Sequence, residues 1–92
     1  MIVRILGKGQ FKMDVKLIDR LNKIDNEIVD HVAKGDEANF RKSLDRLIAA
    51  VGELGEPLDP AAIVRSDLII PPEDLSFEEA KKVFSGHGLI ED

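Results

Sequence analysis

Two histidines are the side chains of this sequence best suited to general acid-base chemistry or metal binding. His31 follows Glu27 by four residues, a spacing that puts both side chains on one helix face. A metal ion needs at least one further ligand, and none is evident, so a solvated helix face is the better interpretation. His87 stands between two glycines, which predicts a turn residue rather than a general base.

Three of the four serines, Ser43, Ser66 and Ser76, also lack the setting of a nucleophile. Ser43 falls within a predicted helix, and Ser76 is placed to cap another. Ser66 precedes Asp67 and is expected to make a local turn bond. None of them lies in a nucleophile elbow.

Neighbouring acids and a glycine-rich turn give no stronger sign of chemistry. Glu73-Asp74 and Glu78-Glu79 flank a helix start, where negative charge is favourable and nothing splits the pKa values of the acids. The run from Gly7 to Gln10 lacks the Gly-Lys-Ser/Thr of a phosphate loop. With no cysteine as well, we expect no enzyme, no cofactor and no metal, and an enzyme or small-molecule binder is the least favoured function.

Length and composition predict one domain over residues 1–92. Hydrophobic residues make up 43% and aromatic residues 4%, which predicts an aliphatic core. The longest apolar run, Leu47 to Val51, is far too short to cross a membrane. Together with the lack of cysteine and of a basic, apolar leader, this predicts a cytoplasmic protein.

The net charge of −5 argues against nucleic acid as a partner. Residues 1–23 carry six Lys or Arg and two Asp or Glu, whereas residues 53–92 carry three and ten. The two ends either lie together or orient a partner. The basic residues near the N-terminus could also bind a membrane directly, but no strongly basic amphipathic helix is present. The members of this set are Arg4, Lys8, Lys12, Lys16 and Arg20.

The first thirteen residues predict a β-hairpin with Gly7 to Gly9 as its turn. Pairing Ile5 with Phe11 gathers the apolar side chains on one face. The same register sets Arg4 opposite Lys12, and like charges in that position repel. Their neutralisation requires an acid, supplied either by a partner or by the C-terminal Glu91-Asp92.

Two helices are predicted next, over residues 15–34 and 37–51. Asp14 and Asp36 are good N-caps, and Gly35 is a natural helix stop. The short connection between the helices predicts an antiparallel pair. Apolar residues recur at three- and four-residue steps in both helices: Leu17, Ile18, Leu21, Ile24, Ile28 and Val32, then Phe40, Leu44, Leu47, Ile48 and Val51.

The remaining residues predict a loop over 52–60, one helical turn from Pro60 to Ile63 and a third strand over 68–70 at a sheet edge. Ser76 opens a short helix over 77–85 that ends at Gly86. Leu89-Ile90 is expected to fold back onto the core. The predicted class is α+β, a small sheet of the hairpin and third strand packed on an antiparallel helical hairpin, with a short C-terminal helix.

The apolar segment that ends in two prolines is either a device that stops edge pairing or a strand that docks a partner. Together with the basic hairpin it gives the candidate partner-binding residues. These are Arg4, Lys8, Lys12, Ser66, Asp67, Leu68, Ile70, Pro71 and Pro72.

Four runs of this sequence, in order, resemble the PspAA domain family, whose members are encoded beside phage shock protein A. They are Met1-Ile2-Val3-Arg4-Ile5-Leu6-Gly7-Lys8-Gly9-Gln10-Phe11, Gly35-Asp36-Glu37-Ala38-Asn39-Phe40-Arg41, Ser66-Asp67-Leu68-Ile69-Ile70-Pro71-Pro72 and Gly88-Leu89-Ile90. The resemblance covers nearly the whole chain, and its motifs are turns and caps rather than chemistry.

The resemblance implies a non-enzymatic adaptor or regulator in the envelope-stress response. Its partner would be phage shock protein A, a coiled-coil protein that coats damaged inner membrane, so the chain would reach the membrane only through that partner. No catalytic residue or cofactor carries over. The alternative is a small structural or regulatory domain that forms homo-oligomers and has no role in membrane stress.

Overall fold

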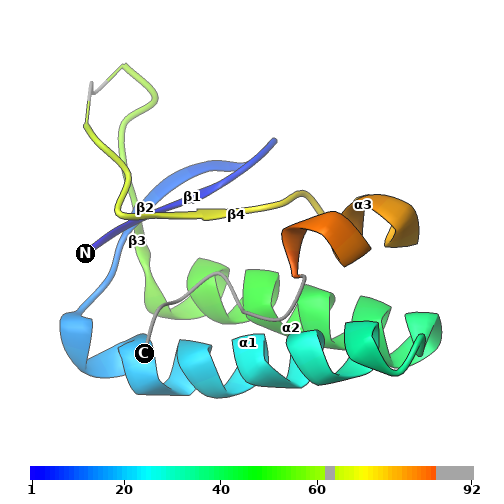
Figure 1. Cartoon of the computed structure of the whole chain (residues 1–92). Coiled ribbons are helices and arrows are strands. Elements are labelled where there is room, and N and C mark those ends of the chain that lie inside the picture. The colour runs from blue at the N-terminus through cyan, green and yellow to red at the C-terminus, as the bar shows by residue number, and fades with distance from the viewer. Residues whose placement is uncertain (62–63, 85–92) are drawn as a thin grey trace.

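The computed structural model describes residues 1–61 and 64–84, and they form two layers (Figure 1). A four-stranded sheet lies over two long antiparallel helices. This is the predicted α+β architecture. The elements are β1 Ile2–Ile5, β2 Gly9–Lys12, the 3-10 helix η1 Val15–Leu17, α1 Ile18–Ala33, α2 Glu37–Leu54, β3 Glu56–Pro57, β4 Leu68–Ile70 and α3 Phe77–Val83.

Strands β1 and β2 form the predicted hairpin, but the predicted register is wrong by two residues. Arg4 lies opposite Gln10, and Ile5 lies opposite Gly9. The amide of Lys8 donates to the carbonyl oxygen of Ile5 at 2.9 Å and closes the turn one residue earlier than predicted. Gly7 allows this turn because its φ of 88° lies in the left-handed region. A shift of two residues leaves every side chain on its predicted face.

The new register removes the expected repulsion between Arg4 and Lys12. Lys12 lies opposite Ile2 on one side and opposite Glu56 of β3 on the other. Glu56 is therefore the cross-strand neighbour of Lys12, although the two side chains form no ion pair, and the neighbours of Arg4 across the strands are uncharged.

The sheet has the order β3-β2-β1-β4, with β4 parallel to β1 at one edge, as an edge strand was predicted there. The predicted loop over 52–60 is wrong. Helix α2 continues through Gly52 to Leu54, and β3 then pairs with β2. A two-residue strand that ends in Pro57 and pairs with residues more than forty positions away leaves no local pattern.

The helix boundaries follow the predicted caps. Asp36 accepts a hydrogen bond from the amide of Asn39 at 3.2 Å, and Ser76 accepts one from the amide of Glu79 at 3.1 Å. Gly35 adopts a φ of 71° between α1 and α2. Asp14 caps η1 rather than α1, so the first predicted helix begins with a tighter turn.

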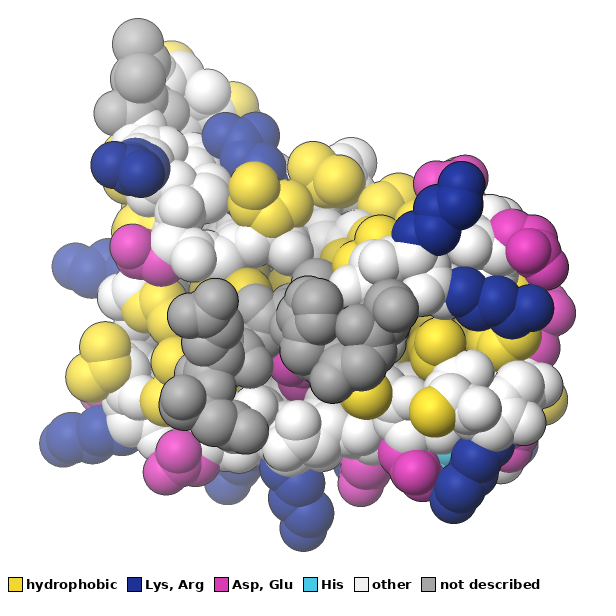
Figure 2. All heavy atoms as spheres, in the orientation of Figure 1, with side chains coloured by type: hydrophobic (Ala, Val, Ile, Leu, Met, Phe, Trp, Pro, Cys, Tyr) yellow, Lys and Arg dark blue, Asp and Glu magenta, His cyan; other side chains and the backbone are white. Residues whose placement is uncertain are grey.

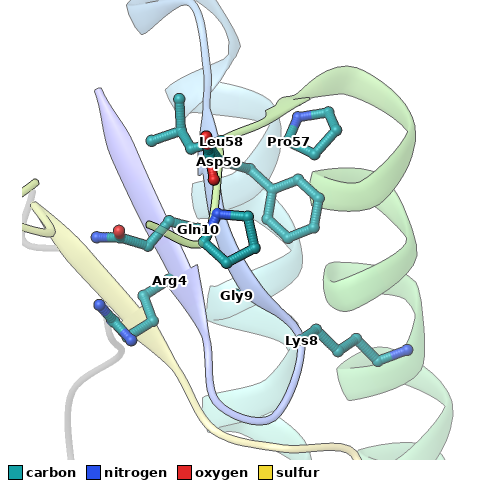
Figure 3. Close-up of a pocket in the computed structure, with 9 residues that line it drawn as sticks. Arg4, Lys8, Gly9, Gln10, Pro57, Leu58 and Asp59 are labelled. Carbon is teal, nitrogen blue, oxygen red and sulfur yellow. The ribbon is translucent and has the colours of Figure 1, made fainter. Parts of the chain in front are cut away.

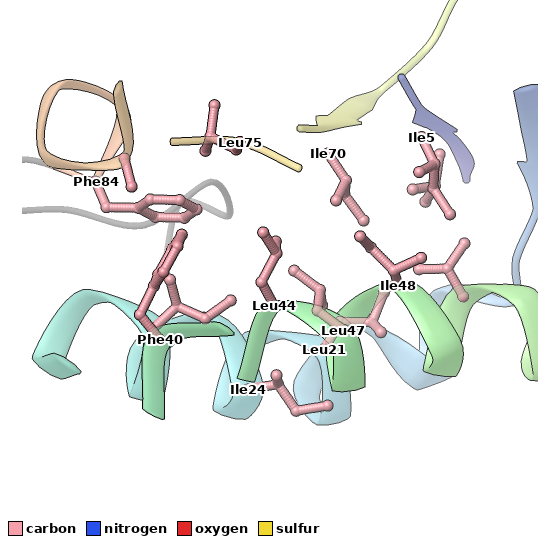
Figure 4. Close-up of a cluster of buried hydrophobic side chains, with 14 of the residues drawn as sticks. Ile5, Leu21, Ile24, Phe40, Leu44, Leu47, Ile48, Ile70, Leu75 and Phe84 are labelled. Atoms are coloured by element: carbon pink, nitrogen blue, oxygen red, sulfur yellow. The ribbon is translucent and has the colours of Figure 1, made fainter. Parts of the chain in front are cut away.

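The core fills the space between the sheet and the helices (Figure 4). Ile5 and Ile70 point from the sheet toward Leu44, Leu47 and Ile48 of the helices, all buried. The predicted apolar faces are confirmed, except that Leu17 and Ile18 are only half-buried. The inner face of the sheet thus holds the two layers together.

Helix α3 is attached to the N-terminal turn of α2 through aromatic side chains. The ring of Phe40 lies edge-on to the rings of Phe77 and Phe84, at centroid distances of 5.6 and 6.3 Å. Such arrangements are the preferred ones for aromatic pairs.

Several predictions fall outside the described residues. They concern the helical turn around Ile63, the helix end at Gly86, the turn at His87, the packing of Leu89-Ile90 and the acidic end Glu91-Asp92.

Candidate functional site

The outer face of the sheet, which α1 and α2 leave uncovered, is the candidate site. Alternate strand residues point to opposite faces, so the outer set follows from the buried inner set. Figure 2 shows hydrophobic side chains exposed along the upper margin, over the sheet, with basic side chains beside them. The outer face is formed by Ile2, Arg4 and Leu6, by Gln10 and Lys12, by Glu56 and by Ile69.

A small polar network ties the connection between β3 and β4 to this face. The side-chain amide of Gln10 donates to the carbonyl oxygen of Val64 and to the hydroxyl oxygen of Ser66, both at 2.8 Å. The Nε of Arg4 donates to the same hydroxyl at 3.3 Å. Ser66 therefore bonds to residues far away in sequence, which the predicted local turn bond did not anticipate.

Asp67 holds β4 against β1. Its carboxylate accepts a hydrogen bond from the amide of Ile2 at 2.8 Å, and its own amide donates to the carbonyl oxygen of Ile2 at 2.8 Å. Both predicted site residues Ser66 and Asp67 thus have structural partners.

A hollow of about 240 Å³ lies between the β1–β2 hairpin and residues 57–60 (Figure 3). Arg4 and Gln10 project to one side of it and Lys8 to the other. Asp59, which also lines it, accepts a hydrogen bond from the amide of Ala61 at 2.9 Å. These groups include a cation, an amide and a carboxylate that is already engaged, but no nucleophile paired with a base.

The basic side chains of the hairpin lack ion pairs. Within the described residues, Arg4, Lys8 and Lys12 have no carboxylate within 4.0 Å. The three ion pairs found there lie on the helices, as between Arg46 and Glu27 at 2.9 Å. Beyond its bond to Ser66, the guanidinium of Arg4 makes no hydrogen bond to a described residue. These charges remain available to an external acid.

The predicted docking segment is mostly turned inward. Ile70 is fully buried against Ile5, and Pro71 is buried. Leu68 and Pro72 are half-buried, and Leu68 packs against the core. The exposed residue of this strand is Ile69, at 51%, which the sequence analysis did not select.

The residues considered for catalysis or metal binding do not form a common site within the described part of the chain. His31 is half-buried on α1, Ser43 is buried in the helix, and Ser76 serves as the predicted cap. Among residues 1–61 and 64–84, no three His, Cys, Asp or Glu side chains gather closely enough to hold a metal ion. In the same part of the chain, no helix is long and apolar enough to cross a membrane.

The sequence analysis missed three residues that matter here. Gln10 organises the polar network, and Leu6 and Ile69 are 44% and 51% exposed. Strict alternation along β1 and β4 could have placed Leu6 and Ile69 outside. Asp25, which is buried on α1 and has a partner, fits the apolar helix stripe so poorly that the pattern excluded it.

Fold and site together define a small α+β protein with helices on one face of its sheet and an uncovered, partly basic opposite face. A family model described as PspA-Associated protein matches residues 1–92. The chain belongs to this family, PspAA, as the four sequence runs had indicated. No curated protein and no solved structure matches the chain.

Proposed function

We propose that the chain is a non-enzymatic, cytoplasmic adaptor or regulator that binds a PspA-like coiled-coil protein in the envelope-stress response. The observation that carries this is the family match over residues 1–92, since the family is described by its association with PspA. The chain acts as one domain and meets the membrane only through this partner.

The basic hairpin supports an electrostatic part in the association. Lys8 and Lys12 are exposed, and no ion pair within the described residues engages them. They stand in a chain whose net charge is −5, so their local positive potential contrasts with the rest of the surface. An acidic segment of the partner would be attracted to this hairpin.

The test is binding of the purified chain to the PspA-like protein of the same genome, measured over a range of salt concentrations. Replacing Lys8 and Lys12 with glutamine should weaken binding by roughly 2- to 30-fold, the range that two exposed ion pairs span, and reduce its salt dependence. The matched control replaces Lys23 and Lys42, which are exposed on α1 and α2, and should change the affinity less than twofold, roughly.

Absence of binding by the unchanged chain would overturn the proposed function. Equal weakening by both pairs would show that overall charge, rather than the hairpin, drives the association. Thermal melting of each variant confirms that the fold is intact.

A further inference from the structure

Two exposed apolar side chains flank Arg4 on the outer face of the sheet. Ile69 is the neighbour of Arg4 across the parallel strands. Leu6 lies two residues after Arg4, directly beyond the end of β1, where its amide donates to the carbonyl oxygen of Ile70 at 3.0 Å. Side chains related in these ways share a face and lie about 5–7 Å apart. Isolated exposed apolar residues are common on proteins, but these two form one surface around a cation.

The connection between β3 and β4 borders this surface on one side, because its Ser66 accepts a hydrogen bond from Arg4. The connection between β3 and β4 rises from the outer side, away from α1 and α2 (Figure 1). Its Val64, 38% exposed, is held there by the hydrogen bond from Gln10. The polar network around Ser66 therefore fixes this connection beside Arg4, which is itself part of the surface.

We propose that this surface, formed by Leu6, Ile69 and Arg4, docks an amphipathic helix of the partner. The partner helix presents apolar residues at positions i and i+3 or i+4 to Leu6 and Ile69, and an Asp or Glu to Arg4. Such a helix adds a third layer to a sheet that has helices on only one side. The proposal deepens the proposed function and rests on it, because it names the segment of the coiled-coil partner that binds.

Charge distinguishes this occupant from the alternatives. A second copy of the chain related by two-fold symmetry would bring Arg4 and Lys12 of both copies together, and like charges oppose that. Nucleic acid and acidic lipid surfaces are negatively charged. The carboxylates of Glu56, Asp59 and Asp67 around the same face would repel them.

An added strand is also a poor occupant. The free edge of β4 has three residues, and Pro71 follows it directly. Such an edge offers few backbone hydrogen bonds. A helix instead uses exposed side chains, which this face supplies.

The experiment titrates the full chain with the full-length PspA-like protein and compares three variants. Ile69→Lys and Leu6→Lys place a charge on the apolar pair, and each should weaken binding about tenfold or more, as loss of an interface anchor does. Val15→Lys is the matched control, since Val15 is 64% exposed but lies on η1. It should leave the affinity within about twofold.

Arg4 is tested separately with Arg4→Gln, which removes the charge and keeps donor groups for Ser66. This variant should lose affinity and also part of the salt dependence. Melting temperatures of all variants should match that of the unchanged chain, because the replaced side chains are exposed.

A second measurement does not depend on substitutions. Methyl signals of Leu6 and Ile69 in NMR spectra should shift when the partner is added, whereas that of Val15 should stay. If the unchanged chain fails to bind, both the function and this surface are overturned. The docking surface is wrong, and the function stands, if the unchanged chain binds, the Ile69→Lys and Leu6→Lys variants bind as tightly as it does, and the methyl signals of Leu6 and Ile69 in the unchanged chain do not shift.

Discussion

The two faces of the sheet come from the same short strands but have opposite environments. On β4, Ile70 is fully buried on the inner face, and its neighbour Ile69 is 51% exposed on the outer face. On β1, Val3 and Ile5 are buried, while Arg4 between them is exposed. The inner face packs against helices, so its side chains stabilise the fold, whereas the outer face is available for recognition.

This difference shows how a small protein separates stability from binding. A substitution on one face should act on folding and leave association unaffected, and one on the other face should do the reverse. The clearest separation of the effects on folding and binding is expected at Ile69 and Ile70, because these neighbours are of the same type and point to opposite faces.

The largest effect is expected in the helices that cover the inner face. Leu21 and Leu44 are fully buried. Replacing either with alanine should lower the free energy of unfolding by about 2–5 kcal/mol, because transfer energy is lost and a cavity remains. Denaturant titration measures this loss, and values below about 1 kcal/mol at both sites would contradict the assigned helix faces.

A smaller effect is expected where α2 ends against β2. A Cβ at Gly55 would lie 2.8 Å from the carbonyl oxygen of Val51 and 3.0 Å from the Cβ of Phe11. Gly55→Ala should therefore cost about 1–3 kcal/mol through overpacking. Gly52→Ala is the control, because it meets nothing within 4 Å inside the helix and should stabilise by roughly 0.5–1 kcal/mol. Similar unfolding free energies for the two variants would rule out the close contact.

The two isoleucines of β4 compare the faces most directly. Ile70→Val removes one buried methylene and should cost about 0.5–1.5 kcal/mol. Ile69→Val makes the same chemical change at an exposed position and should stay within about 0.5 kcal/mol of zero. Chemical denaturation of both variants decides, and an equal loss at the two positions would contradict the proposed division of the faces.

The smallest effect is expected at Asp36, remote from either face of the sheet. Hydrogen bonds from Asn39 hold the pKa of Asp36 below its usual value of 3.8. A lowered pKa in the folded state means that Asp36 stabilises the fold above pH 3.8, and that this contribution is lost as the pH falls below that value. Asp36→Asn keeps a good N-cap without the charge and should lose less stability on acidification, as melting at pH 6 and pH 3 would show. Equal acid losses in both proteins would contradict this assignment.

The sequence by itself determined the elements whose information is local. The apolar residues of the long helices recur at helical spacing, and Asp36, Ser76 and Gly35 stand where helices begin or end. Alternation along the first strand identified the buried Val3 and Ile5. Each of these signals lies within a few residues of the structure that it specifies.

Tertiary structure alone decided the features that join distant segments. Two hairpin registers that differ by two residues keep the same faces, so only the closed turn at Lys8 distinguishes them. Strand β3 forms because β2 offers it a partner, and Ser66 reaches Arg4 across an interval of 62 residues. The exposure of Ile69 likewise follows from the pairing of β4 with β1. These contacts depend on chain segments meeting in space, and no local periodicity encodes that meeting.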